Sequence, residues 1–310
     1  MKIKEYSPSR WLKKIHPSTT IMTSRGCPFD CTFCANATIW HRKYRQRSPQ
    51  NVVREMVHIY NNFGIKGISF CDDLFTADKA WVREICQEIV NTGIGFTWSC
   101  DSRVDTLDRE TMEIMRSSGC WALEFGVESG NELILENMNK GITIPQAIKT
   151  FSLAKELNFG RLAFFIIGYI GETEDTVKQT IDLAKRLNPD SVAFSMATPV
   201  PGTDFQEEAA KRNLITTNDW RDYDFLTSSV CRTESLSTED LMRLQHEAYV
   251  AFYSSRRYLW ENVILKMAGA VSVSRTGRTN AIQYILRAMS NLKLFLEVLP
   301  KSVIHHFRQT

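Results

Sequence analysis

Short apolar segments, rich in β-branched and aromatic residues, alternate with amphipathic helical patterns along the first two thirds of the chain. These segments read as strands covered on both faces, because they are nearly continuous apolar runs. They are TTIMTS (19–24), GISF (67–70), FTWSC (96–100), WALEFGV (121–127), LAFFIIG (162–168) and SVAFSM (191–196). Such a succession of strand–helix units predicts a parallel sheet with right-handed crossovers, either doubly wound or curved into a barrel.

Capping residues mark the helices between these strands. One helix has Pro49 at its first position and Gly64 as its C-terminal stop. Helix starts are predicted at Ser48, Thr143, Thr173 and Ser237. The last start is expected to open a single amphipathic helix, STEDLMRLQHEAYVAFYSSRRYLW, and no clear strand follows it. We therefore expect a lead segment (1–18), a barrel core (19–215) and a mainly helical C-terminal extension (216–310).

The composition is that of a soluble globular protein. The chain has 310 residues, of which 43% are hydrophobic and 24% charged, and its net charge of +3 does not by itself indicate nucleic-acid binding. No run of about 18 apolar residues predicts a membrane span, and the basic N-terminus lacks the apolar stretch of a secretory signal. We expect a cytoplasmic protein in which the five scattered cysteines, Cys71, Cys86, Cys100, Cys120 and Cys231, are reduced thiols.

Three cysteines follow the first predicted strand directly, in the stretch TSRGCPFDCTFCANATIW. Cys27, Cys31 and Cys34 are spaced C-x3-C-x2-C, and thiolates select zinc, Cu(I) or iron–sulfur clusters. His41 could complete a Cys3His zinc site, and a disulfide with one spare thiol is a weaker alternative. In a four-iron cluster, three cysteines would leave one iron open for a ligand. In a (β/α) barrel this loop would lie at the catalytic mouth.

The segment CPFDCTFC resembles the cluster motif of the radical S-adenosylmethionine superfamily, with Phe33 as its aromatic residue. ISFCDDLF is similar to the family's second-strand motif, EFGVESGNE to its fourth, and FIIGYIGET to its fifth, while TPVPGT resembles the loop after the sixth strand. Relatives often have proline where Ile170 stands, which concerns the shape of that loop. The resemblance spans roughly residues 17–215. It implies an α/β fold, a partial (β/α)6 TIM-like barrel of parallel strands with a helical C-terminal extension.

The resemblance also implies a chemistry. A [4Fe–4S] cluster on Cys27, Cys31 and Cys34 would bind the amine and carboxylate of S-adenosylmethionine at its open iron. Reductive cleavage would give a 5′-deoxyadenosyl radical that abstracts hydrogen from an organic substrate. The cofactor carries the difficult step, and the protein supplies ligation, orientation and a dry cavity. The partners expected are a small-molecule or lipid-like substrate and an electron donor such as a flavodoxin or ferredoxin, and the enzyme would be oxygen-sensitive.

Several residues are expected to bind the cosubstrate, on the strength of the resemblance. Phe33 would pack near the adenine, and Asp72 and Asp73 would face the amino group. Arg103 would clamp the carboxylate, and Glu128 would meet the ribose or the amine. Backbone approach and pocket shape are expected from Gly168, Gly171 and Pro199.

Each of these residues also has a structural interpretation. The aspartates could serve turn chemistry, and the glycines and the proline could form ordinary turns. Arg103 could pair with Asp101 or Asp105 as a structural bridge. The basic run HRKYRQRS (41–48) is read as a solvated loop, although a phosphate-bearing substrate or a partner could use it.

The motifs are most similar to members of the superfamily that carry a cobalamin-binding domain in front of the barrel. About 26 residues precede the first cluster cysteine, too few for a domain of about 100 residues, and no D-x-H-x-x-G signature is present. We expect that cobalamin comes from a separate subunit or is not used, or that the gene product is truncated. The alternatives to a hydrogen-abstracting enzyme are a methyltransferase with cobalamin from another subunit, a non-catalytic iron–sulfur partner, and a zinc-stabilised module.

The end of the chain is basic, with nine Lys and Arg against two Glu in residues 256–310. It includes AIQYILRAMSNLKLFLEVL, which is apolar on a broad face. A basic amphipathic helix can lie on an anionic membrane surface, which would suit a lipid substrate and a protein peripheral to the membrane. Packing across the barrel and docking of a partner are the other interpretations.

Overall fold

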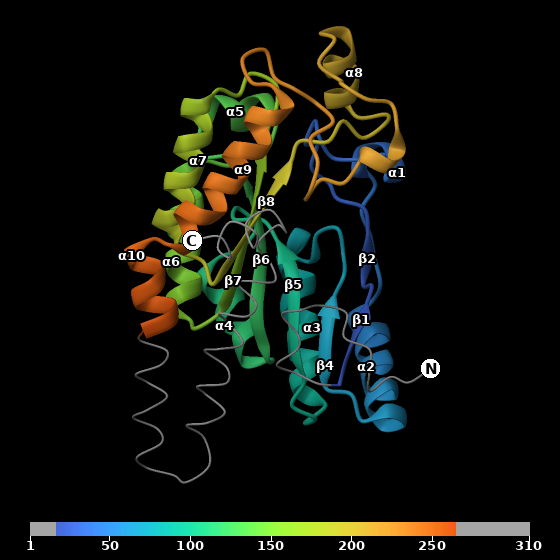
Figure 1. The fold of residues 1–310 in the computed structure, drawn as a ribbon. Coiled ribbons are helices and arrows are strands. Elements are labelled where there is room, and N and C mark those ends of the chain that lie inside the picture. The colour runs from blue at the N-terminus through green and yellow to red at the C-terminus, as the bar shows by residue number, and fades with distance from the viewer. Residues whose placement is uncertain (1–16, 265–310) are drawn as a thin grey trace.

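The computed structural model describes residues 17–264 and shows a six-stranded parallel sheet flanked by helices (Figure 1). The strand order is β1-β4-β5-β6-β7-β8, so each strand pairs with the next one along the chain. The strands are β1 (Ser18–Ile21), β4 (Gly67–Phe70), β5 (Thr97–Ser102), β6 (Cys120–Glu128), β7 (Gly160–Ile167) and β8 (Ser191–Met196). This arrangement confirms the predicted α/β fold, a partial (β/α)6 barrel.

The first predicted strand is divided in two. Residues after Ile21 leave the sheet, and β2 (Ser24–Arg25) pairs antiparallel with β3 (Arg45–Gln46) as a separate two-stranded ribbon. The division follows from a contact with Asp72, just after β4, because its buried carboxylate accepts hydrogen bonds from the backbone of Thr23 and Ser24. The chain is thereby pulled away from the ladder at the carboxyl end of β1.

In chain order the helices are α1 (Asn36–Trp40), α2 (Pro49–Phe63), α3 (Lys79–Asn91), α4 (Arg109–Ser117), α5 (Glu132–Asn137), α6 (Ile144–Glu156), α7 (Glu174–Leu187), α8 (Asp204–Lys211), α9 (Thr238–Tyr253) and α10 (Arg256–Tyr258). The longer helices form a layer against the outer face of the sheet, whereas α1, α5 and α8 lie at its carboxyl end (Figure 1). The caps at Ser48, Thr143, Thr173 and Ser237 are as predicted, each side chain accepting from the backbone of the first turn. The main core lies between this layer and the sheet.

The predicted single helix from Ser237 to Trp260 is wrong over its last seven residues. Helix α9 ends at Tyr253, and Ser255 caps the new short helix α10, which continues into a π-helical turn at Leu259–Ile264. Helix α9 itself packs on β8 and α7. Its Gln245 and Tyr249 side chains bond the backbone carbonyl and amide of Phe194 at 2.7 and 3.0 Å. These contacts cover the edge strand that an open barrel leaves unpaired.

Two sequence predictions cannot be compared with these coordinates. The amphipathic segment AIQYILRAMSNLKLFLEVL lies outside the described residues. The division into 1–18, 19–215 and 216–310 stays a prediction, although Ile215 forms a β-bridge with Cys231 across the second boundary. Among the helices of residues 17–264, none is long and apolar enough to cross a membrane.

Candidate active site

The three cysteines lie on a loop between β2 and α1, at the carboxyl end of the sheet. All three are free thiols, with Cys31 buried and Cys27 and Cys34 half-buried. Together they line a cavity of about 200 Å³. The structure therefore brings together the three residues that the sequence singled out, at the end of the sheet where barrel enzymes place their chemistry.

Two neighbouring aspartates, Asp72 and Asp73, hold the start of this loop by accepting hydrogen bonds from the residues just before Cys27. Asp72 is 4% exposed, and its two oxygens accept from the amide of Thr23 at 2.7 Å, from the Thr23 hydroxyl at 2.8 Å and from the Ser24 amide. Asp73 accepts from the Gly26 amide at 2.8 Å and also lines the cavity. Gly26 has φ 87°, and a Cβ there would lie 2.0 Å from the carbonyl oxygen of Lys43. Only glycine fits this position, one residue before Cys27.

The middle of the loop, from Asp30 to Thr32, is held by hydrogen bonds with residues that are distant in the sequence. The Thr32 amide donates to the carbonyl of Met138 at 3.0 Å, and the Thr32 carbonyl accepts from the Phe205 amide at 3.0 Å. The Asn139 side chain donates to the Asp30 carbonyl at 2.7 Å. The cysteine loop is thus clamped between the ends of α5 and α8.

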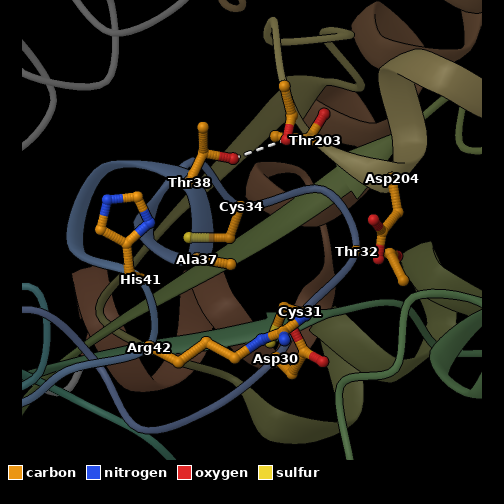
Figure 2. A pocket seen from close by; sticks show the side chains of 11 residues that line it. Asp30, Cys31, Thr32, Cys34, Ala37, Thr38, His41, Arg42, Thr203 and Asp204 are labelled. Atoms are coloured by element: carbon orange, nitrogen blue, oxygen red, sulfur yellow. Dashed lines mark hydrogen bonds and ion pairs between the residues drawn. The ribbon is translucent and has the colours of Figure 1, made fainter.

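A second cavity, of about 380 Å³, lies against the cysteine loop. Figure 2 shows Cys31, Cys34, His41, Thr203 and Asp204 around it. The hydroxyl of Thr38 donates to the Gly202 carbonyl at 2.6 Å, drawn as a dashed line, and joins α1 to the loop before α8. His41 lines this second cavity and not the one shared by the three thiols.

Arg103 lines the cavity beside Cys31 and already uses most of its hydrogen-bonding capacity. Its Nε and Nη2 donate to the two oxygens of Asp105, both at 2.9 Å. Nη2 also donates to the Lys140 carbonyl at 2.6 Å, and Nη1 contacts the Cys31 sulfur at 3.7 Å. The guanidinium stacks 3.7 Å from the ring centroid of Phe29. The bridge to Asp105 is therefore present, and the predicted contact with a carboxylate would use the remaining Nη1 hydrogen.

Glu128 forms a buried ion pair with Lys140, Oε1 to Nζ 2.6 Å, on the cavity wall. Its φ of 68° is unusual for a residue other than glycine and coincides with a register shift in β6. A Cβ on Gly126 would lie 2.4 Å from the Glu128 carboxylate and 2.8 Å from the Lys140 ammonium. Gly126 thus makes room for the pair. The strained backbone is typical of functional positions.

Two further acids, Asp101 and Glu124, line the cavity from adjacent strands, where they are directly paired in register. Burial, together with the nearby carboxylates of Glu124, Asp72 and Asp73, raises the pKa of Asp101 to about 8. Burial also raises the pKa of Glu124. Sequence reasoning missed this pair as well as Lys140 and Gly126. Strand alternation could have indicated Asp101 and Glu124, because it places them on the face of the sheet opposite to that of their buried apolar neighbours.

Of the other residues predicted to bind the cosubstrate, one lines the cavity of the three thiols and three do not. Phe33 lines the cavity, with the Lys140 ammonium 5.9 Å from its ring centroid. Gly168, Gly171 and Pro199 do not line it. Gly168 has φ 94°, and a Cβ there would lie 2.9 Å from Leu241 of α9, so this glycine serves helix packing. The binding roles predicted for these residues, and for Asp72, Asp73, Arg103 and Glu128, stay predictions.

The donor set at the loop fits an iron–sulfur cluster. Burial raises the pKa of the Cys31 thiol, while the positive charges of Lys140 and Arg103 act to lower it. These two cations would stabilise thiolates. Among residues 17–264, no group of three or more His, Cys, Asp or Glu side chains converges on one metal-ion position. A cluster does not need such convergence, because each thiolate binds a different iron.

A partial parallel barrel with thiols and charged groups at the carboxyl ends of its strands defines an enzyme of the α/β-barrel class. The family follows from residues 21–184, which match the model of the Radical SAM superfamily. The chain belongs to this superfamily, which implies a [4Fe–4S] cluster and S-adenosylmethionine.

Relatives of known or assigned activity include methyltransferases and cyclases. The chain is 36% identical over 247 residues to an uncharacterized methyltransferase from Pyrococcus horikoshii, a match covering 80% of this chain and 54% of that protein. It is 29% identical over 239 residues to the anaerobic magnesium-protoporphyrin IX monomethyl ester cyclase of Rubrivivax gelatinosus, covering 76% of this chain and 42% of the cyclase. The chain thus spans about half the length of these relatives.

Solved structures agree on the fold. The radical S-adenosylmethionine methyltransferase TsrM from Kitasatospora setae, with cobalamin and a [4Fe–4S] cluster bound, matches with a TM-score of 0.59 at 22% identity, over 62% of this chain and 39% of TsrM. The cobalamin-dependent radical enzyme OxsB matches with a TM-score of 0.60 at 15% identity, over 89% of this chain and 45% of OxsB.

Proposed function

We propose that this chain is the catalytic core of an enzyme that cleaves S-adenosylmethionine reductively and abstracts hydrogen from an organic substrate. The observation that carries the proposal is the convergence of Cys27, Cys31 and Cys34 on one charged cavity at the carboxyl ends of the strands. The cluster and its cosubstrate supply the one-electron chemistry. The residues of the chain supply ligation, orientation and exclusion of water.

The cavity residues would take separate tasks in this reaction. Asp72 and Asp73 hold the cysteine loop through Thr23, Ser24 and Gly26, and so fix the thiols before the cluster binds. Arg103 and Lys140 place positive charge near the Cys31 sulfur. Glu128 is held by Lys140 and lines the cavity, where its carboxylate would bind a ribose hydroxyl or an ammonium.

A methyltransferase that receives cobalamin from another subunit is the second candidate. It is supported by the names of the relatives, which include methyltransferases and cobalamin-dependent enzymes. In both cases we propose a small organic or lipid-like substrate and a flavodoxin or ferredoxin as electron donor. The proposed contact with a membrane surface depends on the segment beyond residue 264.

Anaerobic reconstitution with iron and sulfide, followed by dithionite and S-adenosylmethionine, tests the proposal. We expect about four irons per chain and formation of 5′-deoxyadenosine and methionine. A matched Cys27→Ala/Cys31→Ala/Cys34→Ala variant should form neither. A full cluster with no cleavage by any reductant would contradict the proposal and favour a non-catalytic iron–sulfur partner, and zinc without iron would favour a zinc module.

A further inference from the structure

The ribbon formed by β2 and β3 carries an unusual pair of charges. Arg25 lies directly opposite Arg45 in the antiparallel register, and both residues are exposed. Like charges placed opposite one another on paired strands destabilise the pairing. Within residues 17–264, neither guanidinium has a carboxylate partner. Among the described residues nothing offsets this repulsion, so both guanidinium groups are available to an acidic partner.

The surface around this pair has the composition of a small interface. Met22, Arg25, Arg45 and Arg47 line one hollow of about 430 Å³, here called the ribbon patch. Met22 is 46% exposed, although it is a large apolar residue. Arg47 differs from the other two arginines because it is paired with Glu55 and donates to the Met22 carbonyl. An exposed apolar side chain among positive charges suits a partner that is acidic around an apolar centre.

The ribbon patch is also joined rigidly to the cysteine loop. Arg25 is two residues from Cys27, a distance of at most about 7 Å between the Cα atoms. Gly26, between them, donates to Asp73 and packs against the Lys43 carbonyl, next to β3. A protein bound at the patch would therefore lie close to the first cluster ligand, on a continuous covalent path to it.

We propose that the ribbon patch is the docking surface for an acidic one-electron carrier protein that reduces the cluster. This inference rests on the proposed function, which requires one electron from outside for each cleavage. The carrier loses one electron and the cluster gains it, and no covalent bond forms or breaks in this step. Steering by opposite charges would speed the encounter, and a small, polar interface would let the carrier leave after transfer.

The test reverses the two unpaired charges in the cluster-loaded protein. The Arg25→Glu/Arg45→Glu variant is compared with Lys149→Glu/Arg256→Glu, which makes the same change in net charge at exposed positions of α6 and α10. Reduced flavodoxin is the probe. Its dissociation constant is measured by fluorescence anisotropy, and the rate of cluster reduction by stopped-flow absorbance. Dithionite, which needs no docking, is the reference reductant, and iron content is checked for every variant.

We expect the ribbon variant to bind flavodoxin at least tenfold more weakly and to be reduced by it at least tenfold more slowly at low salt. Reduction by dithionite should change by less than about twofold, and the wild-type rate with flavodoxin should fall steeply with salt. An equal loss in the control variant, no loss in the ribbon variant, or binding of inorganic phosphate at the patch without binding of flavodoxin would overturn the proposal. Absence of 5′-deoxyadenosine with dithionite would instead contradict the proposed function.

Discussion

Two regions of the sheet bury similar side chains on their outer face and differ on their inner face. One region, here called the polar half, comprises β1, β4, β5 and β6 with the loops that follow them, and the other, the apolar half, comprises β7 and β8 with the loops that follow them. On the outer face, both bury aromatic side chains against the helices: Phe70, Trp98 and Phe125 in the polar half, Phe165 and Phe194 in the apolar half. On the inner face, the polar half carries Asp101, Glu124 and Glu128, which line the cavity of the three thiols. By strand alternation, the apolar half presents Phe164, Ile166 and Ala193 there.

This difference separates what holds the molecule together from what it does. Apolar side chains on the outer face contribute to folding through burial, which is favourable wherever it occurs. Buried carboxylates and ammonium groups oppose folding unless they are paired. These buried charged groups are concentrated on the inner face of the polar half, which therefore indicates the region that serves catalysis. Substitutions in the two regions should accordingly alter different measurements.

The largest expected effect is on the polar half. Replacing Cys34 with alanine should reduce the iron bound after reconstitution from about four per chain to a small fraction, and abolish cleavage of S-adenosylmethionine. The free energy of unfolding of the apoprotein should change little, because Cys34 is half-buried. Cys231→Ala is the matched control, since that buried thiol lies outside the cavity. Retention of a full cluster in the Cys34 variant would refute its assignment as a ligand.

Phe194→Ala should have the opposite result: stability should fall while cluster binding is unchanged. Phe194 is completely buried, stacks on Phe165 and meets the ring of Tyr249 edge-on. We expect the free energy of unfolding in urea to fall by about 3–5 kcal/mol, with iron per folded chain unchanged. If the variant keeps its stability but loses iron, the separation between scaffold and chemistry fails.

The fold was more predictable than the site, for a physical reason. Continuous apolar runs and capping residues are local signals, so the bounds of β4 and β8 and the caps at Ser48 and Thr143 matched the structure. The thiols were predictable because their spacing is local too. Lys140 and Gly126 were missed because their roles depend on the ion pair between Glu128 and Lys140. This pair forms only in the folded chain, and Gly126 leaves the space that it occupies. The break after Ile21 depends on Asp72, about fifty residues away.

The pH dependence of stability provides a third test, on the apolar half. Glu172 is fully buried, and burial raises its pKa from 4.5 to about 8. Between these two values the folded protein binds a proton that the unfolded chain has released. Stability should therefore be greatest at low pH in this window and fall as pH rises toward 8, by at most about 1.4 kcal/mol per pH unit from this group.

Glu172→Gln isolates this contribution, because glutamine keeps the shape but does not titrate. Urea unfolding at several pH values should show a shallower decline for the variant than for the wild type. Asp101 offers the comparison from the polar half. Its pKa is also raised to about 8, but neighbouring carboxylates add to the effect of burial. Identical slopes for wild type and the Glu172 variant would show that Glu172 does not titrate in this range.

The substitution that best sharpens the comparison is Asp72→Ala, whose expected effect on cluster binding is smaller than that of removing a cysteine ligand. Removing this carboxylate leaves the buried amides of Thr23 and Ser24 without acceptors, which should cost about 1–3 kcal/mol. The cysteine loop would loosen, so we expect the reconstituted cluster to be lost faster to a chelator. If Asp72 acts only through the loop, Asp72→Asn, which retains one acceptor oxygen, should restore cluster retention and bind S-adenosylmethionine like the wild type. If the asparagine variant keeps the cluster but binds the cosubstrate weakly, Asp72 contacts the cosubstrate directly, and the polar half supplies binding as well as support.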